Sequence, residues 1–140
     1  RLEGFTITGG ELLGAGGAGV TIVGSSPTIV DSVITGNNAT SNGSAFRALG
    51  GGVRVDGASN PLFTGVAFES NFANGGQGGA IWVGFTGAVA ELEQCTFLNN
   101  RAPGLAGGAI FVAGGGTVIA SGCDFETNDA ESGSGGAVFV

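Results

Sequence analysis

The stretch Gly79-Ala80-Ile81-Trp82-Val83 decides the fold, because it recurs at a nearly constant interval. Close copies are residues 51–55, 108–112 and 136–140, and a looser copy is 18–22. The first apolar residue of each copy stands at position 20, 53, 81, 110 or 138, which gives steps of 33, 28, 29 and 28 residues. A fixed period of this length indicates a repeat protein in which each repeat is one structural unit.

A second phrase keeps the same period: an aromatic or β-branched residue followed three positions later by Asn. It occurs at 68–71, 97–100 and 125–128, with 34–37 as an earlier relative, so Asn stands at 37, 71, 100 and 128. The longer step falls in the same stretch for both phrases. One repeat therefore carries an insertion of about five residues near Asn38 to Gly50.

A third apolar run lies between the two phrases, at 28–30, 61–63, 90–92 and 118–120. The runs are short, rich in β-branched residues and separated by Gly, Asn and Ser, which favours strands joined by turns and excludes helices. We predict an all-β parallel β-helix with three short strands per coil and about five coils of roughly 28 residues. Residues 1–140 are expected to form a single β-helix segment of a longer solenoid or of a fibre subunit.

Coils of this kind stack equivalent side chains at about 4.8 Å. The expected core ladders are Ile34, Phe68, Phe97 and Phe125, and Val20, Val53, Ile81, Ile110 and Val138. Asn37, Asn71, Asn100 and Asn128 are predicted to form a structural ladder, because Asn tolerates a left-handed turn and its amide can bond an identical amide above and below. The Gly pairs before the strands are predicted corners that need positive φ or close packing.

Cys95 and Cys123 occupy the same slot, two residues before the ladder Phe, and are expected to stack inward. A disulfide and two buried free thiols are both compatible with this spacing, and we favour free thiols that act as small hydrophobic groups. Two Cys and no His are too few ligands for a metal site. No metal and no cofactor are predicted.

Charge and composition narrow the function classes. The formal net charge is −7 with only four basic residues, so no nucleic-acid partner is expected. No apolar run is long enough for membrane insertion. Without His a Ser-His-Asp triad cannot form, and no catalytic residue is assigned. The acidic residues Asp124, Glu126, Asp129 and Glu131 are interpreted as a solvated edge, with weak calcium binding as the alternative. Glu91 and Glu93 share one face of a strand, but a single coil does not identify a catalytic pair of carboxylates.

The middle position of the repeated strand holds Thr21, Arg54, Trp82, Phe111 and Phe139. If the flanking Val and Ile point inward, these residues point outward, and Arg54 can contact Trp82 through a cation–π interaction. Arg54, Trp82, Phe111 and Phe139 are therefore a candidate interaction stripe for a protein or glycan ligand. The alternative is that they only stack on one another or lie under a loop.

Asn38-Ala39-Thr40 and Asn42-Gly43-Ser44 match the N-glycosylation tripeptide, which makes Asn38 and Asn42 candidate glycosylation sites in the inserted loop.

The pairing of Gly-Gly-Ala-Ile/Val at 78–81, 107–110 and 135–138 with Phe-x-x-Asn at 68–71, 97–100 and 125–128 resembles the repeats of the chlamydial polymorphic outer-membrane proteins and related bacterial and algal surface proteins. The resemblance is good over roughly 65–140 and loose before that. It implies a right-handed β-helix, display outside the cell and a link to adhesion. The opening residues 2–7 also look like a coil of the wider β-helix class, which includes pectate lyases.

We therefore expect an extracellular or cell-surface structural or adhesive β-helix without catalytic activity, whose bare coil ends meet other copies or further coils of the same protein end to end. The alternative function is a polysaccharide-binding or polysaccharide-cleaving, pectate-lyase-like segment. An outward groove with three or more carboxylates and an Arg would favour that alternative.

Overall fold

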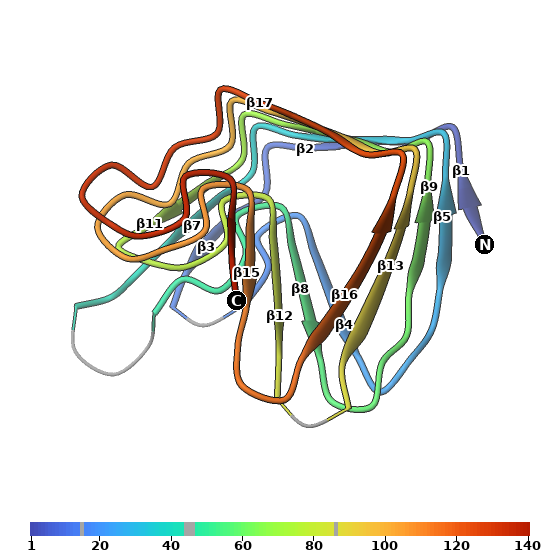
Figure 1. Ribbon diagram of the computed structural model, residues 1–140, viewed down its shortest axis with the longest axis horizontal. Helices are drawn as coiled ribbons and strands as arrows, with labels where there is room; N and C mark the ends of the chain where they lie inside the picture. Colours follow the sequence, from blue (N-terminus) through green and yellow to red (C-terminus); the bar gives the residue numbers. More distant parts are fainter. Residues whose placement is uncertain (15, 44–46, 86) are drawn as a thin grey trace.

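The chain winds into coils that stack on one another, as a computed structural model shows for residues 1–14, 16–43, 47–85 and 87–140. Figure 1 looks along the stack, so that successive coils superimpose. All strand pairs of the named sheets are parallel, and the described residues contain no helix. The predicted all-β parallel β-helix, with coils about 28 residues apart, is confirmed.

Three sheets have one strand from each of five coils, which come from the three predicted apolar runs. Sheet A contains β1 (Leu2–Glu3), β5 (Thr28–Val30), β9 (Leu62–Thr64), β13 (Val89–Glu93) and β16 (Thr117–Ser121). Sheet B contains β2 (Thr6–Thr8), β6 (Val33–Thr35), β10 (Ala67–Glu69), β14 (Thr96–Leu98) and β17 (Asp124–Glu126). Sheet D contains β4 (Val20–Val23), β8 (Val53–Asp56), β12 (Ile81–Gly84), β15 (Ile110–Val112) and β18 (Val138–Phe139).

A fourth sheet was not predicted. Sheet C contains β3 (Glu11–Leu13), β7 (Asn38–Thr40) and β11 (Phe72–Asn74), and isolated bridges at Arg101 continue it into the later coils. Its strands follow directly after the Asn phrase and turn only a small residue inward in the middle coils, such as Ala39 and Ala73, both fully buried. Short strands with a weak apolar signal escape a search for apolar runs, so the early coils have four strands in place of three.

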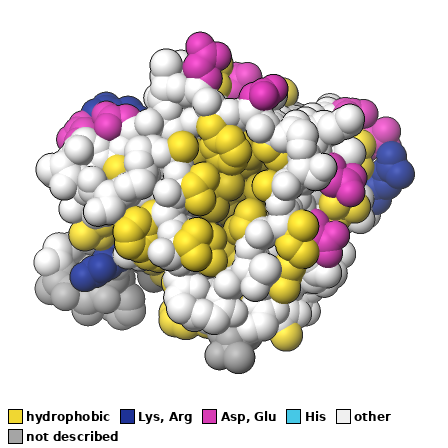
Figure 2. All heavy atoms as spheres, in the orientation of Figure 1, with side chains coloured by type: hydrophobic (Ala, Val, Ile, Leu, Met, Phe, Trp, Pro, Cys, Tyr) yellow, Lys and Arg dark blue, Asp and Glu magenta, His cyan; other side chains and the backbone are white. Residues whose placement is uncertain are grey.

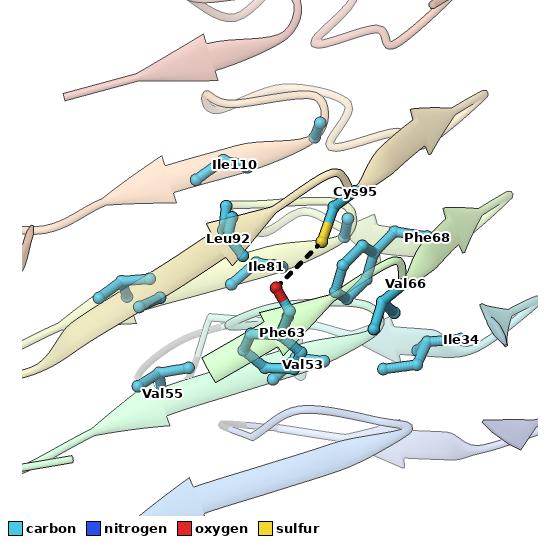
Figure 3. Close-up of a cluster of buried hydrophobic side chains, with 14 of the residues drawn as sticks. Ile34, Val53, Val55, Phe63, Val66, Phe68, Ile81, Leu92, Cys95 and Ile110 are labelled. Carbon is cyan, nitrogen blue, oxygen red and sulfur yellow. Dashed lines mark hydrogen bonds between the residues drawn. The ribbon is translucent and has the colours of Figure 1, made fainter. Parts of the chain in front are cut away.

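The core ladders are in the predicted register. Phe68 pairs with Ile34 on one side and Phe97 on the other, and Phe97 pairs with Phe125. The rings of Phe68 and Phe97 stack with centroids 4.8 Å apart, and those of Phe97 and Phe125 with centroids 4.6 Å apart. Figure 3 shows Phe68 and Ile34 packed with Val53, Ile81 and Ile110 in the interior of the coils. Stacked aromatic and β-branched residues thus fill one continuous core.

The turn before each ladder Asn corrects one detail of the prediction. The left-handed residue is not the Asn itself but the residue before it, at Gly36 (φ 62°), Ser70 (φ 51°), Asn99 (φ 55°) and Thr127 (φ 51°). The Asn is therefore selected for its side chain and not for its backbone.

The Gly corners meet both predicted requirements. Gly78 has φ 68°, a conformation that favours Gly. Its neighbour Gly79 is required for a different reason: a Cβ built there would lie 2.2 Å from the carbonyl oxygen of Gly108, so only Gly lets the next coil approach this closely. One glycine of the pair makes the turn, and the other lets two coils approach.

The insertion lies between β7 and β8. It follows Thr40, so residues 38–40, which we placed at its edge, belong to sheet C. Pairing resumes without a shift, with Val53 opposite both Val20 and Ile81. Among the described residues, no helix is long and apolar enough to cross a membrane.

Candidate functional site

Two residues of the predicted interaction stripe, Trp82 and Phe111, are buried, whereas Arg54 and Phe139 are partly exposed, so the stripe is not the open surface that we expected. Trp82 pairs with Arg54 and Phe111, and Phe111 with Phe139, on the outer face of sheet D as expected. Trp82, however, is only 2% exposed and Phe111 8%. Because a ligand cannot reach side chains this deeply covered, the alternative that the stripe lies under other parts of the chain is correct for Trp82 and Phe111.

Residues from the connections between sheets C and D, and after sheet D, cover the stripe. Leu49 and Ala106 from one side and Ala113 from the other pack on the cluster formed by Trp82 and Phe111. Phe85, one of the exposed apolar residues, meets the indole of Trp82 edge-on with ring centroids 5.3 Å apart. The stripe is thus a second small core outside the sheet.

The stripe also contains the predicted cation–π contact, with the Arg54 guanidinium 5.6 Å from the centroid of the Trp82 ring. Arg54 forms an ion pair with Asp56 on the same strand. Within the described part of the chain, the Nε atoms of Arg54 and Trp82 are buried without a hydrogen-bond partner. Phe111 and Phe139 stack with centroids 5.2 Å apart. These contacts hold the stripe together and leave little of it for a ligand.

The Asn ladder is a continuous chain of side-chain hydrogen bonds. Asn71 donates from its main-chain N and from Nδ2 to Oδ1 of Asn100, both at 3.1 Å, and Asn100 donates in the same way to Asn128, both at 3.0 Å. Asn37 donates equally to Asn71. Each Nδ2 also donates to a carbonyl oxygen of the preceding coil, for example that of Phe68. The amide-to-amide bonding that we predicted is present, and every bond runs from one coil to the next.

Cys95 and Cys123 are free thiols in the same slot of adjacent coils, as favoured from the sequence. The Cys95 thiol is fully buried and lies 3.4 Å from the carbonyl oxygen of Phe63, the contact drawn in Figure 3. Burial raises the pKa of Cys95 from 9.0 to about 11, and the neighbouring Cys123 adds to the effect. A protonated thiol is a poor nucleophile, so Cys95 serves as a small core residue.

The predicted acidic group splits into two places. Asp124 and Glu126 point outward from β17 and, with Glu69, line a shallow hollow of about 530 Å³ on sheet B. Asp129 and Glu131 instead pair with Arg101, whose guanidinium also lies 5.7 Å from the ring centroid of Phe72. Within the described residues, no group of His, Cys, Asp and Glu has a geometry that could hold a metal ion.

The two outward Glu of β13 are held by neutral neighbours. Asn60 donates from Nδ2 to Glu91 at 3.0 Å, and Thr64 donates from its hydroxyl to Glu93 at 3.4 Å.

The two candidate glycosylation sites lie in different surroundings. Asn38 is not in the loop but in β7, where its Oδ1 accepts a 3.3 Å hydrogen bond from the hydroxyl of Thr40. Asn42 is exposed and lies beyond that strand. The third residue of its tripeptide, Ser44, is outside the described residues.

An apolar site lies at the end of the stack that carries β16, β17 and β18. Ile110, Val112, Val118, Phe125, Val138 and Val140 contribute to an apolar hollow of about 410 Å³ on this face. Figure 2 shows hydrophobic side chains gathered at its centre within a mostly polar rim. Phe125 is 37% exposed, whereas its ladder neighbour Phe97 is 1% exposed.

The comparison with protein families is decisive for the fold. The model described as "Right handed beta helix region" matches residues 2–139. The chain belongs to this family. Membership fixes the hand of the helix that the stacked parallel sheets form. The comparisons with curated proteins and with solved structures gave no match.

Proposed function

We propose that this right-handed β-helix is a structural or adhesive module of an extracellular or cell-surface protein and catalyses no reaction. The observation that carries the proposal is the stack of parallel coils, which share one continuous apolar core and a hydrogen-bonded Asn ladder. Each coil of such a stack contacts only its neighbours, so the module is suited to form part of a rod. End-to-end contact with other copies or further coils is the proposed partnership.

The likeness of the Gly-Gly-Ala-Ile and Phe-x-x-Asn phrases to those of the chlamydial polymorphic outer-membrane proteins supports the surface location. Glycan at Asn38 or Asn42 is part of the same proposal, for a eukaryotic secretory route. Any adhesive contact must use a surface other than the buried stripe of Trp82 and Phe111.

Immunogold labelling of intact source cells with an antibody to this chain tests the location. We expect gold on the outer surface of unpermeabilised cells. Labelling that appears only after permeabilisation would refute the surface assignment. Electron microscopy of the native material, in the same preparation, should show the module within rods or filaments, and isolated compact particles would contradict a rod-forming role.

One observation favours the alternative, a pectate-lyase-like polysaccharide enzyme: Glu69, Asp124 and Glu126 share a hollow. The basic partner that such chemistry needs does not line it, since Arg101 pairs with Asp129 and Glu131 instead. Incubation with polygalacturonate and other acidic polysaccharides, followed by an assay for new chain ends, should give no product. Cleavage that Asp124→Asn abolishes would establish the enzyme in place of the structural module.

A further inference from the structure

Sheet C carries an outward aromatic residue that the fold does not require. Slots that build the stack hold the same residue in successive coils, as Asn71 and Asn100 do. The slot that follows them points outward and differs in every coil: in chain order it holds Glu11, Asn38, Phe72, Arg101 and Asp129. Phe72 is only half-buried in this otherwise polar column, so stacking between coils does not explain an aromatic residue there.

Phe72 lies in a hollow on the side of the stack. The hollow has a volume of about 430 Å³, and its other lining residues are Ser70, Asn71, Asn99 and Arg101. Ligand pockets commonly span roughly 300–1,000 Å³. The lining residues belong to the two coils that contain β10 and β14, and these coils lie between those of β6 and β17. The hollow is therefore a feature of the middle of the stack.

Three polar groups around the Phe72 ring are available to a ligand. The Ser70 hydroxyl and Asn99 Nδ2 make no hydrogen bond among the residues that the structure describes, since Asn99 uses only its Oδ1, as the acceptor for a Thr127 hydroxyl. In the same part of the chain, Arg101 uses Nε and Nη2 for its carboxylate partners, which leaves Nη1 unpaired. A ring with N–H and hydroxyl groups at its border offers apolar contact and hydrogen bonds together.

The left-handed turn beside the hollow supports a role for these side chains. Gly9 (φ 68°) and Gly36 (φ 62°) occupy this turn in the first two coils, where Gly adopts positive φ without strain. Ser70 (φ 51°) and Asn99 (φ 55°) occupy it next to Phe72. Positive φ is unfavourable for a residue with a Cβ, and such residues gather at functional sites. Polar side chains thus stand at the hollow in a turn that suits Gly better.

We propose that this hollow binds a neutral pyranose sugar. The C–H face of the sugar packs on the Phe72 ring, and its hydroxyl groups accept hydrogen bonds from Asn99 Nδ2 and Arg101 Nη1. The Ser70 hydroxyl can donate or accept at the border of the ring. The inference rests on the proposed adhesive role, and it names the ligand class and the surface that takes the place of the buried stripe.

The charges around the hollow favour a neutral sugar over an acidic one. Arg101 is held by two carboxylates, those of Asp129 and Glu131, so these three side chains together carry one net negative charge. An acidic sugar would compete with both carboxylates for the guanidinium and would be repelled by the remaining charge. An apolar peptide fits less well, because it would cover the free polar groups without bonding them.

An NMR titration of the isotope-labelled chain tests the site. The neutral probes are cellotetraose, mannotetraose and chitotetraose, and tetragalacturonate is the acidic counterpart. We expect amide shifts at Ser70, Phe72 and Asn99 with at least one neutral sugar, and none there with tetragalacturonate. Phe72→Ala should weaken binding at least about tenfold, as removal of one aromatic anchor does. Phe85→Ala is the matched control, because Phe85 is an exposed aromatic residue outside the hollow, and it should leave the affinity unchanged.

A second variant tests the polar contact. Asn99→Gly removes one donor and suits the left-handed backbone at this position (φ 55°), so we expect a folded chain whose affinity falls about fivefold. Slow amide exchange at Val53 and Ile81, which are fully buried in the core, shows that each variant keeps the stack.

The inference would be overturned by an absence of shifts with all the neutral sugars, by unchanged affinity in Phe72→Ala, or by a preference for tetragalacturonate. Shifts centred on Glu69, Asp124 and Glu126 would also overturn it and would favour the polysaccharide enzyme instead. Neither cell location nor rod formation enters these measurements. Failure of the proposed function and failure of this inference are therefore distinguishable.

Discussion

Replacing Asn100 by Ala should be among the most damaging single changes in the chain. The Asn100 side chain is fully buried and makes four hydrogen bonds: it accepts two from Asn71 and donates to Asn128 and to the carbonyl oxygen of Phe68. At about 1 kcal/mol for each bond, the loss is about 4 kcal/mol. The main-chain N–H of Asn71 is left buried without an acceptor, which adds to that loss.

Asn128→Ala is the matched control, because it removes the same side chain at the open end. This side chain makes three hydrogen bonds, with the main-chain N and Nδ2 of Asn100 and with the carbonyl oxygen of Phe97. It is partly exposed, so water can replace some of them, and we expect a loss of about 1–2 kcal/mol. The two variants should therefore differ by about 2–3 kcal/mol.

Urea unfolding followed by the fluorescence of the single Trp82 measures both losses, and amide exchange at Asn71 localises the first. Asn100→Ala should accelerate exchange at Asn71, and Asn128→Ala should not. Equal destabilisation by the two variants, or unchanged exchange at Asn71, would refute the interpretation that the buried side-chain amides of the ladder stabilise the stack.

Three further outcomes follow from burial and packing. Gly79→Ala should lower the free energy of unfolding by more than about 3 kcal/mol, because its Cβ would lie 2.2 Å from a neighbouring carbonyl oxygen. Gly114→Ala, where a Cβ would have no atom within 4 Å, should change it by no more than about 0.5 kcal/mol. Similar urea midpoints for the two variants would contradict this. The Cys95 thiol has a pKa of about 11 in the folded chain, against 9.0 in the unfolded chain. Its contribution to the free energy of unfolding is therefore fully present below pH 9, and about 2–3 kcal/mol of that free energy is lost as the pH rises to 11. Cys95→Val, which copies Val66 of the preceding coil, should remove that slope in stability measured against pH. Trp82 should show blue-shifted emission and weak iodide quenching at 2% exposure, and strong quenching would restore an accessible stripe.

The fold could be predicted from the sequence because its determinants repeat. Each coil requires the same small set of residues at the Gly corner and before the Asn, so periodicity alone locates ladders such as Phe68 to Phe125. The side-chain amide bonds of Asn71 and Asn100 could be predicted for the same reason. A ladder places the same residue requirement on every coil, so it can be recognised as a periodic pattern in the sequence.

The coverage of the stripe could not be predicted, because it depends on contacts between segments that do not repeat. The outward direction of Trp82 follows from strand alternation, but its burial depends on Leu49 and Ala106, which lie in connections without a regular pattern.

The connection between β7 and β8 shows how this architecture accommodates extra sequence. Twelve residues separate Thr40 from Val53, whereas six separate Asn74 from Ile81 one coil later, yet both flanking pairs keep their register. The stacking of the coils is fixed by the sheets and the Gly corners, whereas the number of residues in this connection can vary. We therefore expect a foreign peptide inserted between Thr40 and Val53 to leave the register of the flanking strands unchanged, which makes this connection suited to acquiring new binding loops.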